Sequence, residues 1–166
     1  GGSGYGRRVS FGRGYVKASL HECFTANRDH YPVLLPRLSE APETMLAHLR
    51  LHNGTIWRWN RPLIGFDEPP GHAPIPHLRM EHRVAAAGPS AADNVANAAF
   101  YFGAVHAMAA AEEPPERRIS FPQARANFYL AAEYGLDAEL PWDEAHRVKL
   151  AEIILERLLP MAHAGL

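Results

Sequence analysis

The sequence predicts an α+β fold in which an antiparallel sheet is flanked by helices. Two segments, residues 55–64 and 77–85, alternate large apolar and polar side chains with the period of two that is typical of β-strands. Residues 66–76 between them are rich in Pro and Gly, which predicts a loop and favours an antiparallel hairpin. Helical patterns follow from residue 90 onward, and strands followed by a run of helices are typical of α+β domains.

The N-terminal part of the chain carries weaker signals. Residues 1–14 are expected to form a flexible or partial N-terminal segment, with short strands within 7–19 on either side of a glycine-rich turn. Ser19 and Glu22 have the spacing of a capping box and predict a helix start. Residues 42–51 predict a second helix, which Asn53 and Gly54 would end.

The C-terminal half predicts three helices. Ser90 and Asp93 form a capping box before an apolar stripe that includes Val95, Phe102 and Val105. A second box at residues 120–123 opens a helix that runs to residue 134 and ends at a glycine. The last helix is expected to begin at residue 143, with apolar residues along one face as far as residue 161.

Composition excludes some classes of function. The chain has 166 residues and a net charge of -1 with neutral histidines, which argues against a broad basic footprint for nucleic acid. No apolar run reaches the roughly 20 residues that cross a bilayer, so no membrane partner is expected. The single cysteine, Cys23, fits a reducing compartment and predicts a cytoplasmic location. His48 and His52 have helical zinc-ligand spacing, but the rest of the H-E-x-x-H pattern is missing.

The two predicted strands carry most of the chemical information. Along the second strand, alternation places arginines and a glutamate on one face and mostly apolar residues on the other. Along the first, it separates Trp57 and Trp59, expected as a buried anchor, from two polar residues on the opposite face. If the strands are neighbours, one sheet face gathers Arg58, Asn60, Arg79, Glu81 and Arg83.

Such a face has a chemical use as well as a plain structural reading. Arginine binds phosphate or carboxylate oxygens with two parallel hydrogen bonds, and a carboxylate together with phosphate oxygens is how Mg²⁺ is usually held. The face therefore predicts a site for an anionic ligand with a divalent metal. The structural alternative is a solvated face with weak ion pairs, and an arginine-aromatic groove for nucleic acid is a further one.

Three long motifs carry a resemblance to a known family. Residues 51–62, 77–83 and 87–100, with shorter matches at 124–129 and 135–138, resemble the C-terminal catalytic portion of the glutamate–cysteine ligase type 2 (carboxylate–amine ligase) family. The resemblance begins near residue 15 and covers most of the chain. It implies a glutamine-synthetase-like catalytic fold and an ATP-dependent, Mg²⁺-dependent ligase. Such enzymes phosphorylate a carboxylate, and an amine then attacks the acyl phosphate to form an amide.

The resemblance also implies roles for individual residues. Glu81 would bind the metal, and Arg83 would contact an ATP phosphate or the acyl phosphate. Arg83 and Arg58 are the catalytic candidates. The candidates for contact with nucleotide or substrate are Arg79, Arg83, Asn60, Arg61 and His52.

The chain also departs from the family. Family members are considerably longer, and their N-terminal part supplies paired acidic metal ligands for which this sequence offers no acidic cluster. We therefore expect residues 15–166 to be the C-terminal part of a ligase catalytic domain, incomplete alone. Its expected partners are small-molecule amino-acid substrates, the N-terminal part of the same enzyme and a possible homo-oligomeric copy. The alternative is a non-catalytic anion-binding, nucleotide-binding or assembly module derived from that fold.

Overall fold

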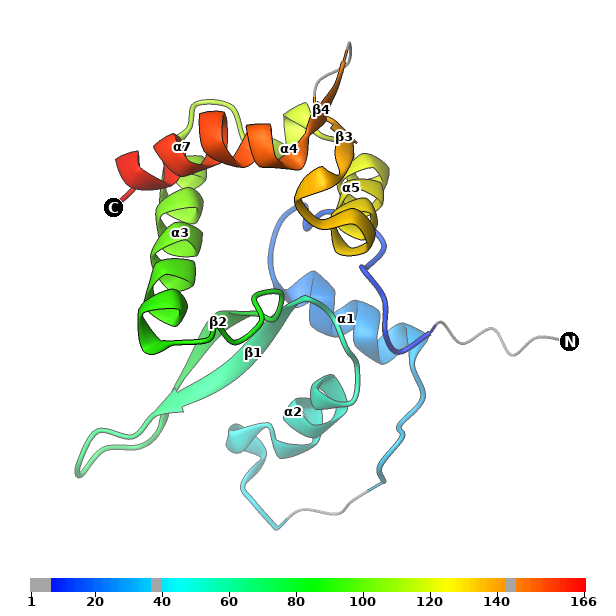
Figure 1. The fold of residues 1–166 in the computed structure, drawn as a ribbon. Coiled ribbons are helices and arrows are strands. Elements are labelled where there is room, and N and C mark those ends of the chain that lie inside the picture. Colours follow the sequence, from blue (N-terminus) through cyan, green and yellow to red (C-terminus); the bar gives the residue numbers. More distant parts are fainter. Residues whose placement is uncertain (1–6, 37–39, 143–145) are drawn as a thin grey trace, which may run out of the picture. The chain divides into compact units, whose positions relative to one another are not determined.

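A computed structural model describes residues 7–36, 40–142 and 146–166 of the chain. It combines helices with two separate antiparallel sheets of two strands each, so the predicted α+β class is confirmed (Figure 1). The chain divides into two units, Gly1–Val84 and Ala85–Leu166, which we describe separately. Among the described residues, no helix combines the length and the apolar character that a membrane span requires.

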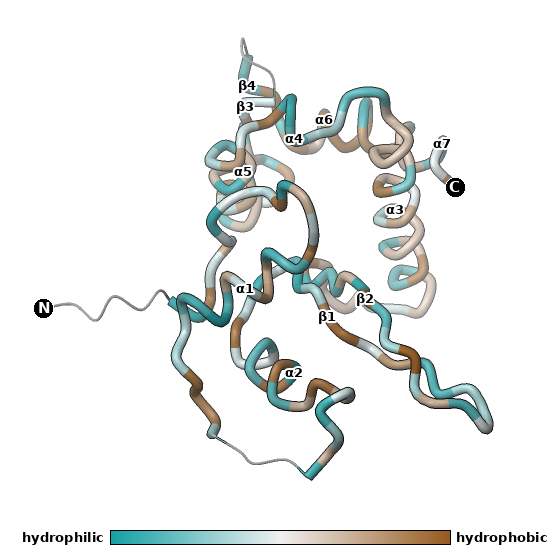
Figure 2. Tube along the Cα trace, turned by 180° about the vertical axis from the view of Figure 1, so that it is seen from behind, coloured by the Kyte–Doolittle hydropathy of each residue, from teal (hydrophilic) through white to brown (hydrophobic). Residues whose placement is uncertain are grey.

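The N-terminal unit is built from helices followed by a β-hairpin. Its elements are α1 (His21–His30), the 3₁₀-helix η1 (Glu43–Met45), α2 (Ala47–Gly54), β1 (Asn60–Asp67) and β2 (Ile75–His82). Helices α1 and α2 contact each other, and α2 also contacts β1. In Figure 2 the middle of β1 is brown, whereas the loop at the hairpin tip is mostly teal or pale, as expected of a solvated turn.

Helix α1 begins close to the predicted position. The Glu22 carboxylate accepts hydrogen bonds from the backbone N–H groups of Ala18 (2.6 Å), Ser19 (3.0 Å) and Lys17 (3.2 Å). The bonds from Ala18, Ser19 and Lys17 hold the pKa of the Glu22 carboxyl below its usual value of 4.5. One half of the predicted capping box is therefore present. The Ser19 hydroxyl accepts from the N–H of His21 rather than from that of Glu22.

The predicted helix over 42–51 is broken into η1 and α2. Leu46, between them, has a φ of 51°, a left-handed conformation that ends one helix before the next begins. Helix α2 ends at Gly54, in the Asn53-Gly54 pair that was expected to end it, and so runs three residues beyond the predicted residue 51. A leucine at positive φ carries no sequence signal, because Gly and Asn are the residues that usually adopt it.

The hairpin confirms the predicted antiparallel pairing but shifts both strands. The predicted start of the first strand instead forms a turn after α2, since Thr55 N–H donates to the His52 carbonyl and Ile56 N–H to the Asn53 carbonyl. Strand β1 therefore begins at Asn60, and the loop spans only 68–74. Residues 7–19 form no strand in the described part of the chain. Their ladder contact is a single parallel bridge between Val9 and Trp57.

The C-terminal unit is mostly helical with one small hairpin. Its elements are α3 (Ala91–Ala110), α4 (Pro115–Arg118), α5 (Phe121–Tyr134), the 3₁₀-helix η2 (Gly135–Asp137), β3 (Glu139–Pro141), β4 (Arg147–Lys149), α6 (Leu150–Ile153), the π-helix η3 (Ile154–Leu158) and α7 (Leu159–Ala164). The core of this unit centres on Ala138, Leu140 and Ile153, around which side chains from α5, β4 and the last helical run pack.

The helix starts in this unit follow the predicted caps. Ser90 and Asp93 form the full capping box of α3. The Ser120 hydroxyl caps α5, which ends at Gly135 as predicted. The predicted helix start at residue 143 lies outside the described residues, but β4 occupies Arg147–Lys149, so the helical run begins only at Leu150. The β3–β4 hairpin was not predicted from the sequence, where its two strands have only three residues each.

Helix α3 runs up to α7 in Figure 1 and contacts it. The contact is made through small residues of α3 rather than through its predicted apolar stripe. Gly103 is buried, and a side chain added there would overlap the backbone carbonyl of Ala162 in α7. The stripe residues Val95, Phe102 and Val105 are exposed. The expectation that they form the packed face is therefore wrong, because the close approach of two backbones selects glycine and alanine instead.

Candidate anion-binding site

The site lies on the face of the hairpin where Arg61 and Glu81 oppose each other. The ladder pairs Arg61 with Glu81 and Asn60 with His82. Directly paired residues share a sheet face, so Arg61 lies on the Glu81 face and Asn60 on the other. The predicted face with Arg58 and Asn60 beside Glu81 is therefore wrong. A shift of one residue in register exchanges the faces of a whole strand.

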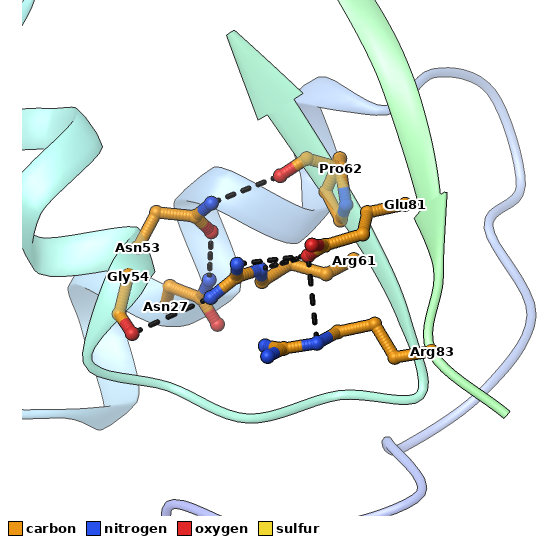
Figure 3. Close-up of polar contacts among 7 residues, drawn as sticks. All are labelled: Asn27, Asn53, Gly54, Arg61, Pro62, Glu81 and Arg83. Atoms are coloured by element: carbon orange, nitrogen blue, oxygen red, sulfur yellow. Dashed lines mark hydrogen bonds and ion pairs between the residues drawn. The ribbon is translucent and has the colours of Figure 1, made fainter. Parts of the chain in front are cut away.

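Arg61 holds Glu81 firmly. Its Nη2 lies 2.8 Å from Glu81 Oε2 and its Nε donates to the same oxygen at 3.0 Å (Figure 3). Its Nη1 donates to the carbonyl of Gly54 at 3.4 Å, which links the strand to the end of α2. Only 14% of the Arg61 side chain is exposed. Arg61 is therefore a largely buried cation whose charge Glu81 neutralises.

A buried asparagine pair fixes the position of this strand. The Asn53 side-chain amide accepts from Asn27 Nδ2 and donates to the Pro62 carbonyl, both at 2.9 Å (Figure 3). Both asparagines are buried. The pair joins α1, α2 and β1 next to Arg61. The sequence pattern does not indicate this role, because an Asn-Gly pair at the end of a helical pattern is typical of a cap or turn.

Arg83 is held differently from Arg61. Its Nε lies 3.7 Å from Glu81 Oε2, beyond hydrogen-bond distance, and its guanidinium carbon lies 3.4 Å from the ring centroid of Trp57. No N–H of the guanidinium donates a hydrogen bond within the described part of the chain, although only 25% of the side chain is exposed. We call Arg61, Glu81 and Arg83 the arginine row. Its two arginines and one glutamate have a net charge of +1, and Arg83 carries the charge that Glu81 does not neutralise.

Arg58 lies apart from this row. Its Nη2 donates to the Tyr31 hydroxyl at 3.0 Å, and its guanidinium carbon lies 5.5 Å from the centroid of the Tyr31 ring. Arg8 lies 5.8 Å from the same ring. Within the described chain, no hydrogen bond, ion pair or ring contact joins Arg58 to Glu81 or Arg83. The structure therefore does not bring the two catalytic candidates, Arg83 and Arg58, into contact.

The remaining candidates have other surroundings. Arg79 shares the Glu81 face but is exposed and pairs across the ladder with Leu63. Asn60 Oδ1 lies 2.7 Å from His82 Nδ1 on the opposite face, and burial lowers the pKa of the His82 imidazole. His52 Nε2 donates to the Asn27 carbonyl at 3.1 Å, and its buried Nδ1 has no hydrogen-bond partner among the described residues. His52 therefore braces α1 against α2.

The apolar expectations for the two strands are also corrected. Trp57, expected as a buried anchor, is 37% exposed and lies under Arg83. Leu78 and Met80, expected to face a core, are exposed. The contacts of β1 with α2 bury Pro62 instead, so the burial falls on β1 rather than on β2.

The described residues do not make a metal centre by themselves. No group of three His, Cys, Asp or Glu side chains gathers among them. Glu81, the predicted metal ligand, already interacts with Arg61 and Arg83 through one carboxylate oxygen. A single carboxylate paired with arginine does not fit a Mg²⁺ site, which requires several oxygen ligands.

The charge of the chain is unevenly distributed, a signal that the net charge conceals. Residues 1–84 contain 11 Lys and Arg against 7 Asp and Glu, a net charge of +4. Residues 85–166 contain 6 against 11, a net charge of -5. The unit that contains the arginine row is therefore basic, which favours an anionic ligand.

Comparison with protein-family models, with curated proteins and with solved structures finds no match for this chain. The resemblance to carboxylate–amine ligases therefore depends on the sequence motifs alone.

Proposed function

We propose that Arg83 binds an anionic oxygen group, and that this contact belongs to an ATP-dependent carboxylate–amine ligase resembling glutamate–cysteine ligase. One observation carries the proposal. Arg83 is a three-quarters-buried cation whose guanidinium N–H groups have no acceptor among the described residues. Phosphate and carboxylate oxygens are the acceptors that match its forked donors.

The neighbours of Arg83 support the same ligand class. Glu81 is already neutralised by Arg61, so it repels an incoming anion less than a free carboxylate would. Arg79 lies on the same face and adds a positive charge near the row. In a ligase of this kind, ATP supplies the phosphoryl group that activates the carboxylate. The arginines of this chain bind and orient the anionic oxygens.

The proposal assigns a limited part of the chemistry to this chain. Because Glu81 alone does not fit a magnesium site, further metal ligands would come from the N-terminal part of the same enzyme. Under this proposal the ligase works in the cytoplasm, joins small amino-acid substrates into an amide and is built on a glutamine-synthetase-like fold. This chain alone is then expected to show no amine-dependent ADP release.

Calorimetric titration tests the anion site. Inorganic phosphate and ATP, each with and without Mg²⁺, are titrated into the wild-type chain and into Arg83→Gln. We expect Arg83→Gln to weaken binding of both ligands by at least about tenfold, since a charged donor pair is lost. Arg125→Gln is the matched control, because Arg125 is an exposed residue of α5 and its substitution changes the net charge equally. Equal binding by Arg83→Gln and the wild type would reject the site.

A second candidate is a non-catalytic anion-binding module. The absence of a three-ligand metal group among the described residues favours it. The same titrations, repeated with the N-terminal part of the enzyme added, separate the two functions. A ligase-derived site binds ATP more tightly with Mg²⁺ once the N-terminal part is supplied, whereas a simple module binds phosphate independently of the metal.

A further inference from the structure

The contact between Arg83 and Trp57 is the closest cation–π contact in the described chain. The guanidinium carbon of Arg83 lies 3.4 Å from the indole ring centroid, a distance of direct van der Waals contact. The three other such contacts, which involve Arg8, Arg50 and Arg58, lie between 5.4 and 5.8 Å from their rings. The guanidinium of Arg83 therefore rests directly on the indole ring.

Backbone hydrogen bonds hold both partners of this contact. Trp57 N–H donates to the Arg8 carbonyl at 2.8 Å, and the Trp57 carbonyl accepts from Ser10 N–H at 3.3 Å. Arg83 N–H donates to the Trp59 carbonyl at 2.8 Å. Residues 59 and 83, more than twenty positions apart in the sequence, are thus joined next to the stack, and Trp57 is also joined to residues 8–10. These bonds hold the backbone of Trp57 and that of Arg83 near each other, which keeps the indole ring within reach of the guanidinium.

We propose that Trp57 is the positioning residue of the anion site: its indole face holds the Arg83 guanidinium so that the N–H edge stays available to a phosphate or carboxylate. This inference rests on the proposed function of Arg83. A free arginine side chain samples many rotamers, and ordering it on binding lowers affinity. The stack orders the guanidinium before the anion arrives. It engages a ring face only, so it uses none of the hydrogen-bond donors.

The test compares two substitutions of the same residue. Trp57→Phe keeps an aromatic ring face for the guanidinium. Trp57→Leu removes the aromatic ring but keeps an apolar side chain. Phosphate and ATP affinities of both variants are measured by calorimetry. We expect Trp57→Leu to weaken binding about three- to tenfold and Trp57→Phe less than about threefold, since phenylalanine retains part of the cation–π attraction. Equal affinities of Trp57→Leu and the wild type would overturn the inference.

A double-mutant cycle separates positioning from a general effect on the fold. In an Arg83→Gln background, Trp57→Leu should cause no further loss of phosphate affinity, because the residue that it positions is gone. A further loss of the same size in that background would show that Trp57 acts through the fold and would overturn positioning. Far-UV circular dichroism of all variants confirms that each is folded.

A fluorescence readout keeps the proposal testable if Trp57→Leu does not fold. The chain has three tryptophans, at 57, 59 and 142, and Trp59→Phe with Trp142→Phe leaves Trp57 as the only emitter. Phosphate binding should change its emission, and Arg83→Gln should abolish that change. Unchanged emission at saturating phosphate would overturn the inference. If the wild type binds neither phosphate nor ATP, the proposed function fails as well, whereas weaker binding by Arg83→Gln together with wild-type affinity of Trp57→Leu removes only the role of Trp57.

Discussion

Arg61 and Glu81 occupy directly opposed positions of the β1–β2 ladder, and Arg61 Nη2 approaches Glu81 Oε2 to 2.8 Å. This ion pair decides which arginine of the hairpin is available for a ligand. Arg61 uses Nε, Nη1 and Nη2 within the protein, whereas the guanidinium of Arg83 donates no hydrogen bond within the described chain and makes a looser ion pair, from Nε to Glu81 Oε2 at 3.7 Å. The same carboxylate thus keeps one cation in a structural role and leaves the other for binding.

Glu81→Gln should change stability and anion binding in opposite directions. Removing the carboxylate leaves the largely buried Arg61 without its charged partner, which we expect to lower the free energy of unfolding by about 1–2 kcal/mol. Phosphate affinity without metal should rise severalfold, because the repulsive charge is gone. Urea unfolding and calorimetry measure the two effects. Glu113→Gln, which breaks an exposed pair with Arg118, should change stability by less than about 0.5 kcal/mol. A fall in metal-free phosphate affinity would contradict this account of the site.

Asn53→Ala should destabilise the N-terminal unit strongly. The substitution leaves Asn27 Nδ2 and the Pro62 carbonyl without their buried partner, and each unsatisfied group costs about 1–3 kcal/mol. We expect the free energy of unfolding to fall by about 2–4 kcal/mol in urea titrations. Asn97→Ala, at an exposed position of α3, should stay within about 0.5 kcal/mol of the wild type. Similar unfolding midpoints for both variants would show that the Asn27–Asn53 pair does not stabilise the N-terminal unit.

Gly103→Ala should loosen the contact between α3 and α7. The added Cβ would overlap the carbonyl of Ala162, which the backbone of α7 cannot relieve by a rotamer change. We expect a loss of about 1–3 kcal/mol, the usual cost of overpacking. Gly54→Ala is the matched control, because a Cβ there meets open space and alanine favours the helix by up to about 1 kcal/mol. The unfolding temperature should therefore fall for Gly103→Ala and rise for Gly54→Ala. Stabilisation by both would mean that the helices separate freely.

Glu22→Gln should destabilise α1 at neutral pH but not in acid. The folded protein lowers the pKa of the Glu22 carboxyl below 4.5 through hydrogen bonds from Ala18, Ser19 and Lys17. A depressed carboxyl pKa stabilises the folded state above the unfolded value, and this stability is lost as the pH falls through the folded pKa. The unfolding temperatures of variant and wild type should therefore differ at pH 7 and converge as the pH falls through the folded-state pKa, which lies below 4.5. A difference that persists unchanged in acid would exclude the carboxylate as its cause.

The helix ends illustrate what local chemistry predicts well. Ser90 and Asp93 form the box that their spacing predicts, and Gly135 ends α5 where the apolar pattern stops. These features depend on residues three or four positions apart, so a short stretch of sequence contains all of the information. The π-helix η3 is a partial exception. It precedes Pro160, whose missing N–H cannot continue the regular bonding, although the sequence pattern alone predicted an unbroken helix.

The alternation along the second strand was also determined by the sequence. It placed Arg79, Glu81 and Arg83 on one face, and the ladder confirms that Arg79 and Glu81 share a face. Which residue of the first strand opposes Glu81 was decided by the tertiary structure. The turn that follows α2 takes up residues 55 and 56, and the ladder starts at Asn60. In this register Arg61, and not Asn60, lies opposite Glu81. A one-residue register depends on contacts between distant segments, and no local pattern encodes it.

The sequence by itself determined the α+β class, the hairpin, the helix caps and the arginine-rich strand that carries Glu81. Only the tertiary structure distinguished the arginines from one another. Arg61 forms an ion pair with Glu81, Arg58 donates a hydrogen bond to Tyr31, and Arg83 stacks on Trp57. All three are charged residues of one short region, and in sequence they look alike. What separates them is the set of acceptors and rings that folding brings within about 4 Å of each guanidinium, because hydrogen bonds and ion pairs act only at such short range.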